Sequence, residues 1–139
     1  MDDFRAHLEA AVDAVLAQGL KPVFLVVELA GAADIKRVHG VDSLVKFRDA
    51  ATGAIVAAGG GCESFTYGEE RVVAILPGFE RLKTFAIIDK LRRGLPYLAQ
   101  SFDCVLHPEF DVIEYDLTTG IGGVIAQLVR LAQLRRDVA

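Results

Sequence analysis

A polar triplet between two strand-like segments constrains this chain more than any other feature. Gly68-Glu69-Glu70 separates the segment 63–67 from Arg71–Leu76, an apolar run rich in β-branched residues. Runs of this kind favour buried strands, and a glycine with polar neighbours favours a tight turn. Pro77-Gly78 ends the second segment. We therefore expect a β-hairpin with strands at 63–67 and 71–76.

Strand and helix patterns surround this hairpin. The continuous apolar run Val23–Leu29 predicts a strand buried on both faces. The alternation at 110–117 predicts a half-exposed strand whose apolar side contains Ile113, Tyr115 and Leu117. The helix at 80–95 is expected to stop at Gly94–Pro96, because proline lacks the N–H that continues a helix. Its apolar side is expected to contain Leu82, Phe85, Ile88, Leu91 and Leu95. Helical spacing of apolar residues predicts the remaining helices, which are one between Phe4 and Gly19 and others near 32–38, 42–58 and 121–136.

The order of these elements predicts the fold class. Without the first and last helices it reads strand, helix, hairpin, helix, strand, which is the ferredoxin-like βαββαβ plan. We expect an α+β fold with an antiparallel or mixed sheet, helices on one face, and extra N- and C-terminal helices. At 139 residues the chain is expected to form one domain, residues 1–139. This plan supports many unrelated functions, so it does not decide the activity.

Composition narrows the possible partners. The formal net charge of −4 gives no electrostatic footprint for nucleic acid. No apolar run approaches the ~20 residues of a membrane span, and the chain opens with Asp2-Asp3 rather than a basic leader. Cys62 and Cys104 belong to no metal-ligand spacing. We expect a cytoplasmic protein without membrane insertion, nucleic-acid partner or cofactor.

Three segments carry a resemblance to a known family. They are Val27-Glu28-Leu29 at the end of the first strand, His39-Gly40, and Tyr67-Gly68-Glu69-Glu70 before a Val-Val-Ala-Ile-Leu-Pro-Gly strand. Through them the segment from Phe4 to Leu95 resembles the diguanylate cyclase (GGDEF) domain. Members of this family condense two GTP molecules into cyclic di-GMP, with two magnesium ions and two domains facing each other. The resemblance implies the palm-type nucleotidyl cyclase form of the predicted fold.

The resemblance also implies that the base-reading residues have changed. It gives Glu28 the role of a magnesium-binding carboxylate and places a guanine-reading Asn at Lys36. A second guanine contact, an Asp in the family, falls on Val45, which can accept no hydrogen bond. A site built to hydrogen-bond a base discriminates by ~10⁴ or more through such contacts. We therefore expect the selection of GTP to be lost.

The hairpin aligns with the family motif in two registers, and the sequence leaves both open. One register gives Glu70 the metal-binding position and puts Arg71 in place of the following acid. The other, aligned on Gly68, keeps Glu69 and Glu70 and puts Tyr67 at the first glycine position. A phenol ring there would block the close backbone approach that glycine permits to a phosphate.

Other ligand positions of the family also differ in this chain. The inhibitory product site, Arg-x-x-Asp in the family, corresponds to the segment from Gly59 to Cys62 and has lost both charged residues. Glu28 and Glu70 are weak metal candidates, because a hard cation needs several converging oxygens. We expect no bound metal and no cyclic di-GMP at the inhibitory site.

Two functions remain compatible with these residues. The first is a non-catalytic GGDEF-like pseudoenzyme, a regulatory module in bacterial signalling or cell organisation that binds another protein or a second copy of itself. The alternative is a sensor that binds a GTP-like nucleotide without turnover. An enzyme of other specificity would need Glu28 to share a site with Glu69-Glu70. No catalytic residue is expected, and the predicted remnant of the nucleotide and metal site comprises Glu28, Lys36, Gly68, Glu69, Glu70 and Arg71.

Overall fold

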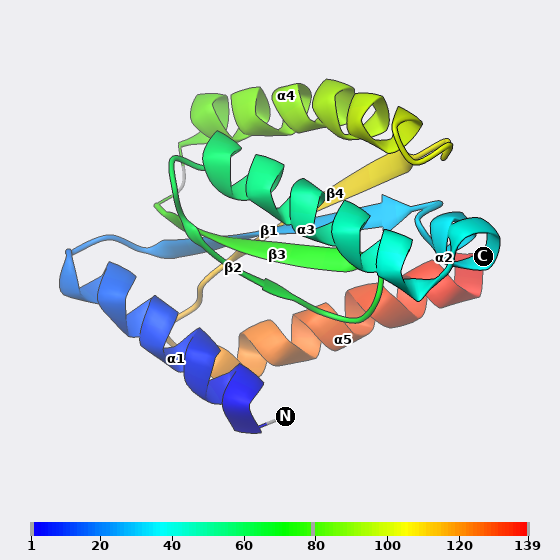
Figure 1. The fold of residues 1–139 in the computed structure, drawn as a ribbon. Helices are drawn as coiled ribbons and strands as arrows, with labels where there is room; N and C mark the ends of the chain where they lie inside the picture. Colours follow the sequence, from blue (N-terminus) through cyan, green and yellow to red (C-terminus); the bar gives the residue numbers. More distant parts are fainter. Residues whose placement is uncertain (1, 79, 139) are drawn as a thin grey trace.

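Strands and helices follow one another in the predicted α+β order (Figure 1). The computed structural model describes residues 2–78 and 80–138, and the side chains of 4–78 and 80–134. None of the helices in this part combines the length and apolar character that crossing a membrane requires. The elements are α1 (Asp2–Ala17), β1 (Pro22–Ala30), α2 (Ala33–His39), α3 (Val41–Ala58), β2 (Glu63–Thr66), β3 (Arg71–Pro77), α4 (Arg81–Gln100), β4 (His107–Glu114) and α5 (Gly120–Val138).

The strands form an antiparallel sheet in the order β2-β3-β1-β4. β3 pairs with one side of β1, and Glu28 lies opposite Arg71 at the end of that pairing. β4 pairs with the other side, where Val23 lies opposite Glu114. β1 is therefore an inner strand that pairs with both β3 and β4. This arrangement confirms the ferredoxin-like plan and resolves the sheet as antiparallel.

Both faces of the sheet are covered by helices. α3 and α4 lie over one face, and α1 and α5 lie over the other (Figure 1). The two helices of the ferredoxin-like core share one face as predicted, and the extra terminal helices close the second. Because β1 alternates between two cores, its apolar run is continuous, and each fully buried side chain contributes about 1.5–3 kcal/mol. One core contains Val23, Leu25, Val27 and Leu29 of this strand, and the other contains Phe24 and Val26.

α4 differs from the prediction in its length and in its buried side. It continues through Pro96 to Gln100, although a proline inside a helix costs about 3 kcal/mol. Leu95 and Ala99 are fully buried on either side of that proline, so packing holds the helix together there. Leu82 and Phe85, expected on the buried side, are 84% and 58% exposed. Ile88, Leu91 and Leu95 are buried as predicted, and Thr84 and Ala99 complete the buried stripe.

The last strand lies earlier in the chain than expected. β4 begins at His107 and ends at Glu114 rather than spanning 110–117. Leu117, predicted on the buried side of the strand, is 75% exposed. The reason is a local turn in which the Thr118 N–H donates to the Asp116 carboxylate at 2.8 Å and carries the chain away from the sheet.

The turn after β1 supplies a test of the backbone geometry. Gly31 has φ +105°, and a Cβ there would lie 2.7 Å from the Val105 carbonyl oxygen. We expect Gly31→Ala to lower the free energy of unfolding by about 2–4 kcal/mol. Gly53 lies inside α3 with open space around it. Gly53→Ala should raise that free energy by about 0.5–1 kcal/mol. Urea unfolding measures both variants, and a Gly31→Ala protein as stable as the parent would contradict the geometry.

Candidate functional site

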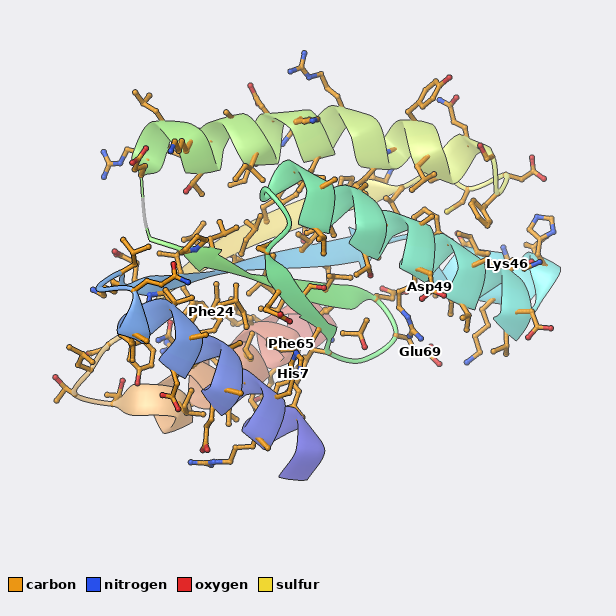
Figure 2. The ribbon with its side chains drawn as sticks, turned by 60° about the vertical axis from the view of Figure 1, so that its left-hand side comes forward. His7, Phe24, Lys46, Asp49, Phe65 and Glu69 are labelled. Atoms are coloured by element: carbon orange, nitrogen blue, oxygen red, sulfur yellow. The ribbon has the colours of Figure 1, made fainter. Side chains whose placement is uncertain are left out.

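The residues predicted for the site gather at one end of the sheet. Glu28 is near the end of β1, and Lys36 lies on α2 just beyond it. Glu69 lies in the turn between β2 and β3, on the side of α3 (Figure 2). Gly68 adopts φ +78° in the same turn, a backbone conformation that glycine takes without strain. The fold thus brings together segments that are far apart in the sequence.

Glu28 is paired with Arg71 across the two central strands. The Nε atom of Arg71 lies 2.6 Å from Oε2 of Glu28, and their side chains are 17% and 10% exposed. The Nε–H itself makes no hydrogen bond, so at this nitrogen the contact is a charge pairing. Breaking such a buried pair leaves an uncompensated charge, which is strongly destabilising. The pair therefore holds the ends of β1 and β3 together.

Glu69 is paired with Lys36 at the surface. The Lys36 ammonium donates to the Glu69 carboxylate at 2.8 Å. This hydrogen bond and the charge of Lys36 hold the pKa of Glu69 below its ordinary value, and the charge of Arg48 adds to the effect. The contact connects α2 to the hairpin turn. Because both groups are exposed, its contribution to stability is small.

Glu70 bonds the backbone on either side of the turn after β1. Its carboxylate accepts the Ala33 N–H at 2.9 Å, at the first residue of α2. Its carbonyl accepts the Leu29 N–H at 2.6 Å. A carboxylate at a helix N-terminus satisfies an N–H without an intrahelical partner and complements the helix dipole. Glu70 thus acts as the cap that α2 lacks locally, since Ala32 offers no capping side chain.

These contacts bear on whether the site can hold a divalent cation. Magnesium needs several oxygen ligands that converge on one point. Glu28 faces the guanidinium of Arg71, and the Glu70 carboxylate is directed to the α2 backbone. Among the described residues, no group of three or more His, Cys, Asp or Glu side chains could hold a metal ion. The residues as placed do not fit a magnesium ion.

Tyr67 packs between α1 and the hairpin. Its ring centroid lies 5.9 Å from that of Phe4, which also meets Phe65 edge-on at 4.8 Å. His7 approaches Phe65 from the same helix (Figure 2), with ring centroids 6.4 Å apart. The Tyr67 ring therefore belongs to the packing of α1. No local pattern indicated this role, because the aromatic rings come from separate segments.

Arg48 adjoins the site although no sequence motif includes it. It lies on α3, and its charge contributes to the lowered pKa of Glu69. Its Nε atom is buried and has no hydrogen-bond partner among the described residues. Only the packing of α3 against the hairpin turn could identify this residue, so the sequence-based prediction omitted it.

The positions that correspond to the inhibitory site lie after α3. Gly59 follows the last residue of that helix, and a Cβ there would lie 2.7 Å from the Cys62 Sγ. Burial raises the pKa of the Cys62 thiol. Gly59 and Cys62 thus adjoin each other without a charged side chain between them. Leu76, near the end of β3, lies beside Gly59, so this turn is at the opposite end of β3 from Arg71.

Solved structures of other proteins are similar to this chain in architecture. The GGDEF domain of DgcB from Caulobacter crescentus, crystallised in complex with c-di-GMP, superimposes with a TM-score of 0.68 at 13% identity, over 96% of this chain and 85% of that one. A sensory box/GGDEF family protein from Caulobacter crescentus CB15 gives 0.55 at 14% identity, over 86% and 80%. No family model and no curated protein matches the sequence. The chain therefore has a GGDEF-like fold.

The buried ion pair predicts that Arg71 contributes much more to the stability of the fold than the exposed Arg37 does. Arg71→Met leaves Glu28 without its guanidinium, and we expect the free energy of unfolding to fall by about 2–4 kcal/mol. Glu28→Gln combined with Arg71→Met should recover most of that loss. Arg37→Met removes an exposed partner of Asp34 and should change the free energy of unfolding by less than about 1 kcal/mol. Urea unfolding measures all three, and equal losses from the two arginine variants would contradict the role of the pair.

The pairing of Lys36 with Glu69 predicts a change in the pKa of Glu69 that NMR can measure. Lys36→Met should raise the pKa of the Glu69 carboxyl towards its ordinary value, because the hydrogen bond and charge that lower it are gone. Since the folded-state pKa is the lowered one, the pair stabilises the fold above the unfolded-state pKa and loses its effect as the pH falls through the folded value. Lys46→Met on α3 is the control and should leave the Glu69 pKa unchanged. Carboxyl ¹³C titration reports all of these values, and an unmoved pKa in Lys36→Met would contradict the pairing.

Proposed function

We propose that this protein is a non-catalytic GGDEF-like domain that works through contact with another protein in a signalling pathway. The supporting observation is that Glu28, Glu69 and Glu70 are each engaged by other groups of the chain, namely Arg71, Lys36 and the α2 backbone. A cyclase needs acidic side chains that can turn to a metal ion. The fold alone assigns no activity, so the proposal depends on the chemistry of these residues.

An apolar surface beside the site supports the interaction role. Val45, where the resemblance places a guanine contact, is 37% exposed. Val41 lies one helical turn before it and is 57% exposed, and Val38 at the end of α2 is 60% exposed. We call Val38, Val41 and Val45 the valine patch. Exposed aliphatic side chains offer no hydrogen bond to a base, and their burial against another protein is favourable.

The non-catalytic half of the proposal has a direct assay. The purified protein is incubated with GTP and either Mg²⁺ or Mn²⁺, beside an active GGDEF cyclase as the positive control. We expect no cyclic di-GMP by chromatography at times when the control has consumed its GTP. Product above the level of a protein-free sample would overturn this half of the proposal.

The interaction half is tested by changing the valine patch. Capture of partner proteins by the parent chain is compared with capture by Val41→Asp/Val45→Asp. The matched control is Val105→Asp/Val129→Asp, which alters exposed valines elsewhere. We expect a partner that the parent and the control retain and the patch variant loses. Identical capture by all three proteins would contradict the use of this surface.

A nucleotide sensor is the second candidate, and Arg48 is the observation in its favour. Its buried Nε lacks a hydrogen-bond partner among the described residues, and Lys36 is a second cation beside the same turn. A phosphate group could pair with both cations without any metal-assisted step. Calorimetric titration with GTP discriminates: heat that Lys36→Met/Arg48→Met abolishes would support the sensor, and silence at millimolar nucleotide would exclude it.

A further inference from the structure

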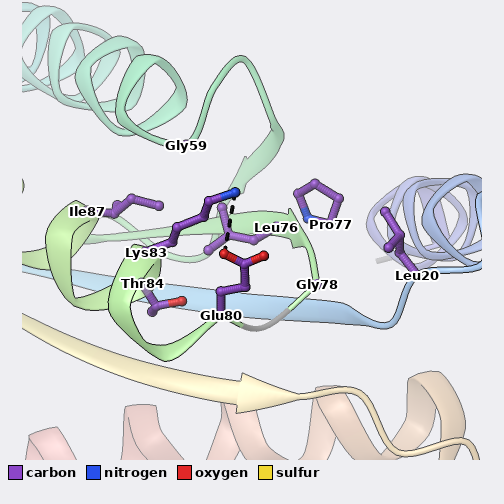
Figure 3. A pocket seen from close by; sticks show the side chains of 9 residues that line it. All are labelled: Leu20, Gly59, Leu76, Pro77, Gly78, Glu80, Lys83, Thr84 and Ile87. Atoms are coloured by element: carbon purple, nitrogen blue, oxygen red, sulfur yellow. Dashed lines mark ion pairs between the residues drawn. The ribbon is translucent and has the colours of Figure 1, made fainter.

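A pocket lies at the other end of the sheet from the candidate site. Its volume is about 380 Å³, and it is bounded by the end of α3, the end of β3 and the first turns of α4 (Figure 3). Pro77, at the end of β3, is one of its lining residues, whereas Arg71 begins that strand. The length of β3 therefore puts the pocket about 20 Å from the Glu28–Arg71 pair. A ligand here would be separate from anything bound at the hairpin turn.

Thr84 is a buried polar group without a side-chain partner in this pocket. The residue is 3% exposed, and its hydroxyl makes no hydrogen bond with a described residue. The oxygen is turned towards Glu80 and the interior of the pocket (Figure 3). The hydroxyl oxygen is not itself fully buried, because it opens on the pocket, and it can donate a hydrogen bond to a ligand there. A ligand that supplies an acceptor would take the place of water at this hydroxyl.

The first turn of α4 adds donors to the same pocket. This helix is 20 residues long and begins at Arg81, and the preceding residue, Glu80, makes no side-chain capping bond. The first N–H groups of a helix have no intrahelical acceptor, and the helix dipole places partial positive charge there. An anionic group is therefore favoured at this end of α4.

The side chains around the pocket limit the charge of such a ligand. Among the described residues that line the pocket, Lys83 is the one cation, and its ammonium lies 3.4 Å from the Glu80 carboxylate across the pocket (Figure 3). Both side chains are exposed, so the pair is weak and Lys83 can turn to another anion. One partly compensated cation suits a single negative charge better than a phosphate dianion. Leu20, Leu76 and Ile87 supply apolar walls for the rest of the ligand.

We propose that this pocket binds a small monocarboxylate with an aromatic or branched aliphatic body. The carboxylate accepts hydrogen bonds from the Thr84 hydroxyl and the first N–H groups of α4, and it pairs with Lys83. The body packs against Leu76 and Ile87. The volume suits a ligand of this size, since small-molecule sites begin at about 300 Å³. This inference goes beyond the proposed function and does not depend on it.

Amide NMR of the ¹⁵N-labelled protein tests the ligand class. Benzoate and 4-methylpentanoate are titrated to millimolar concentration. Benzamide, which lacks the charge, and acetate, which lacks the body, are the comparators. We expect saturable shifts at the amides of 81–84 and Gly78 with the first two compounds only. Absence of saturation, or equal affinity for benzamide and benzoate, would overturn the proposal.

Three variants assign the binding to the named groups. Thr84→Val keeps the shape of the side chain, and we expect it to raise the dissociation constant of benzoate about fivefold. Lys83→Gln, at an exposed position that the fold does not need, should weaken binding at least as much. Lys90→Gln, exposed on the same helix outside the pocket, should leave it unchanged. Parent-like affinity in both Thr84→Val and Lys83→Gln would overturn the proposal, even if one of them were less stable.

Discussion

The structure depends on the burial of β1 between two neighbouring strands and two helical layers. Every second side chain of this strand enters one core, and the intervening side chains enter the other. A strand of this kind needs an apolar residue at nearly every position, and Val23–Leu29 supplies it, Glu28 excepted. The terminal helices are part of this arrangement because, without α1 and α5, Phe24 and Val26 would face water. The single acidic residue of the run is tolerated because Arg71 lies opposite it.

The sequence predicted the elements well where one periodicity dominated. The hairpin, β1 and the order of helices all followed from runs of apolar residues and from turn residues. Prediction failed where tertiary packing opposed a local signal. Pro96 indicated a helix end, yet the buried residues on both sides of it keep α4 continuous. Leu82 and Phe85 were assigned to the core by their hydrophobicity, while the phase of the helix buries Thr84 in their place.

The fold brings the predicted site residues together, and the sequence did not indicate the contacts that they make there. The resemblance placed Glu28, Lys36 and the hairpin turn near one another, and the fold does so. The pairing of Glu28 with Arg71 depends on strand register, and the capping of α2 by Glu70 joins residues 37 positions apart. Neither follows from local spacing. At this end of the sheet the acidic side chains have partners, while the buried Nε atoms of Arg48 and Arg71 make no hydrogen bond with a described residue.

The pairing of β1 with β4 has a consequence for the order of folding. Val23 forms its cross-strand pair with Glu114, so the two residues come together only after about 90 intervening residues have been made. Until then the nascent chain has an apolar strand with one unpaired edge, which is the type of surface that chaperones and misfolded partners recognise. A fragment that stops before His107 would keep the whole hairpin turn and still lack the edge that closes β1. Such fragments are thus poor substitutes for the full chain in any search for its partners.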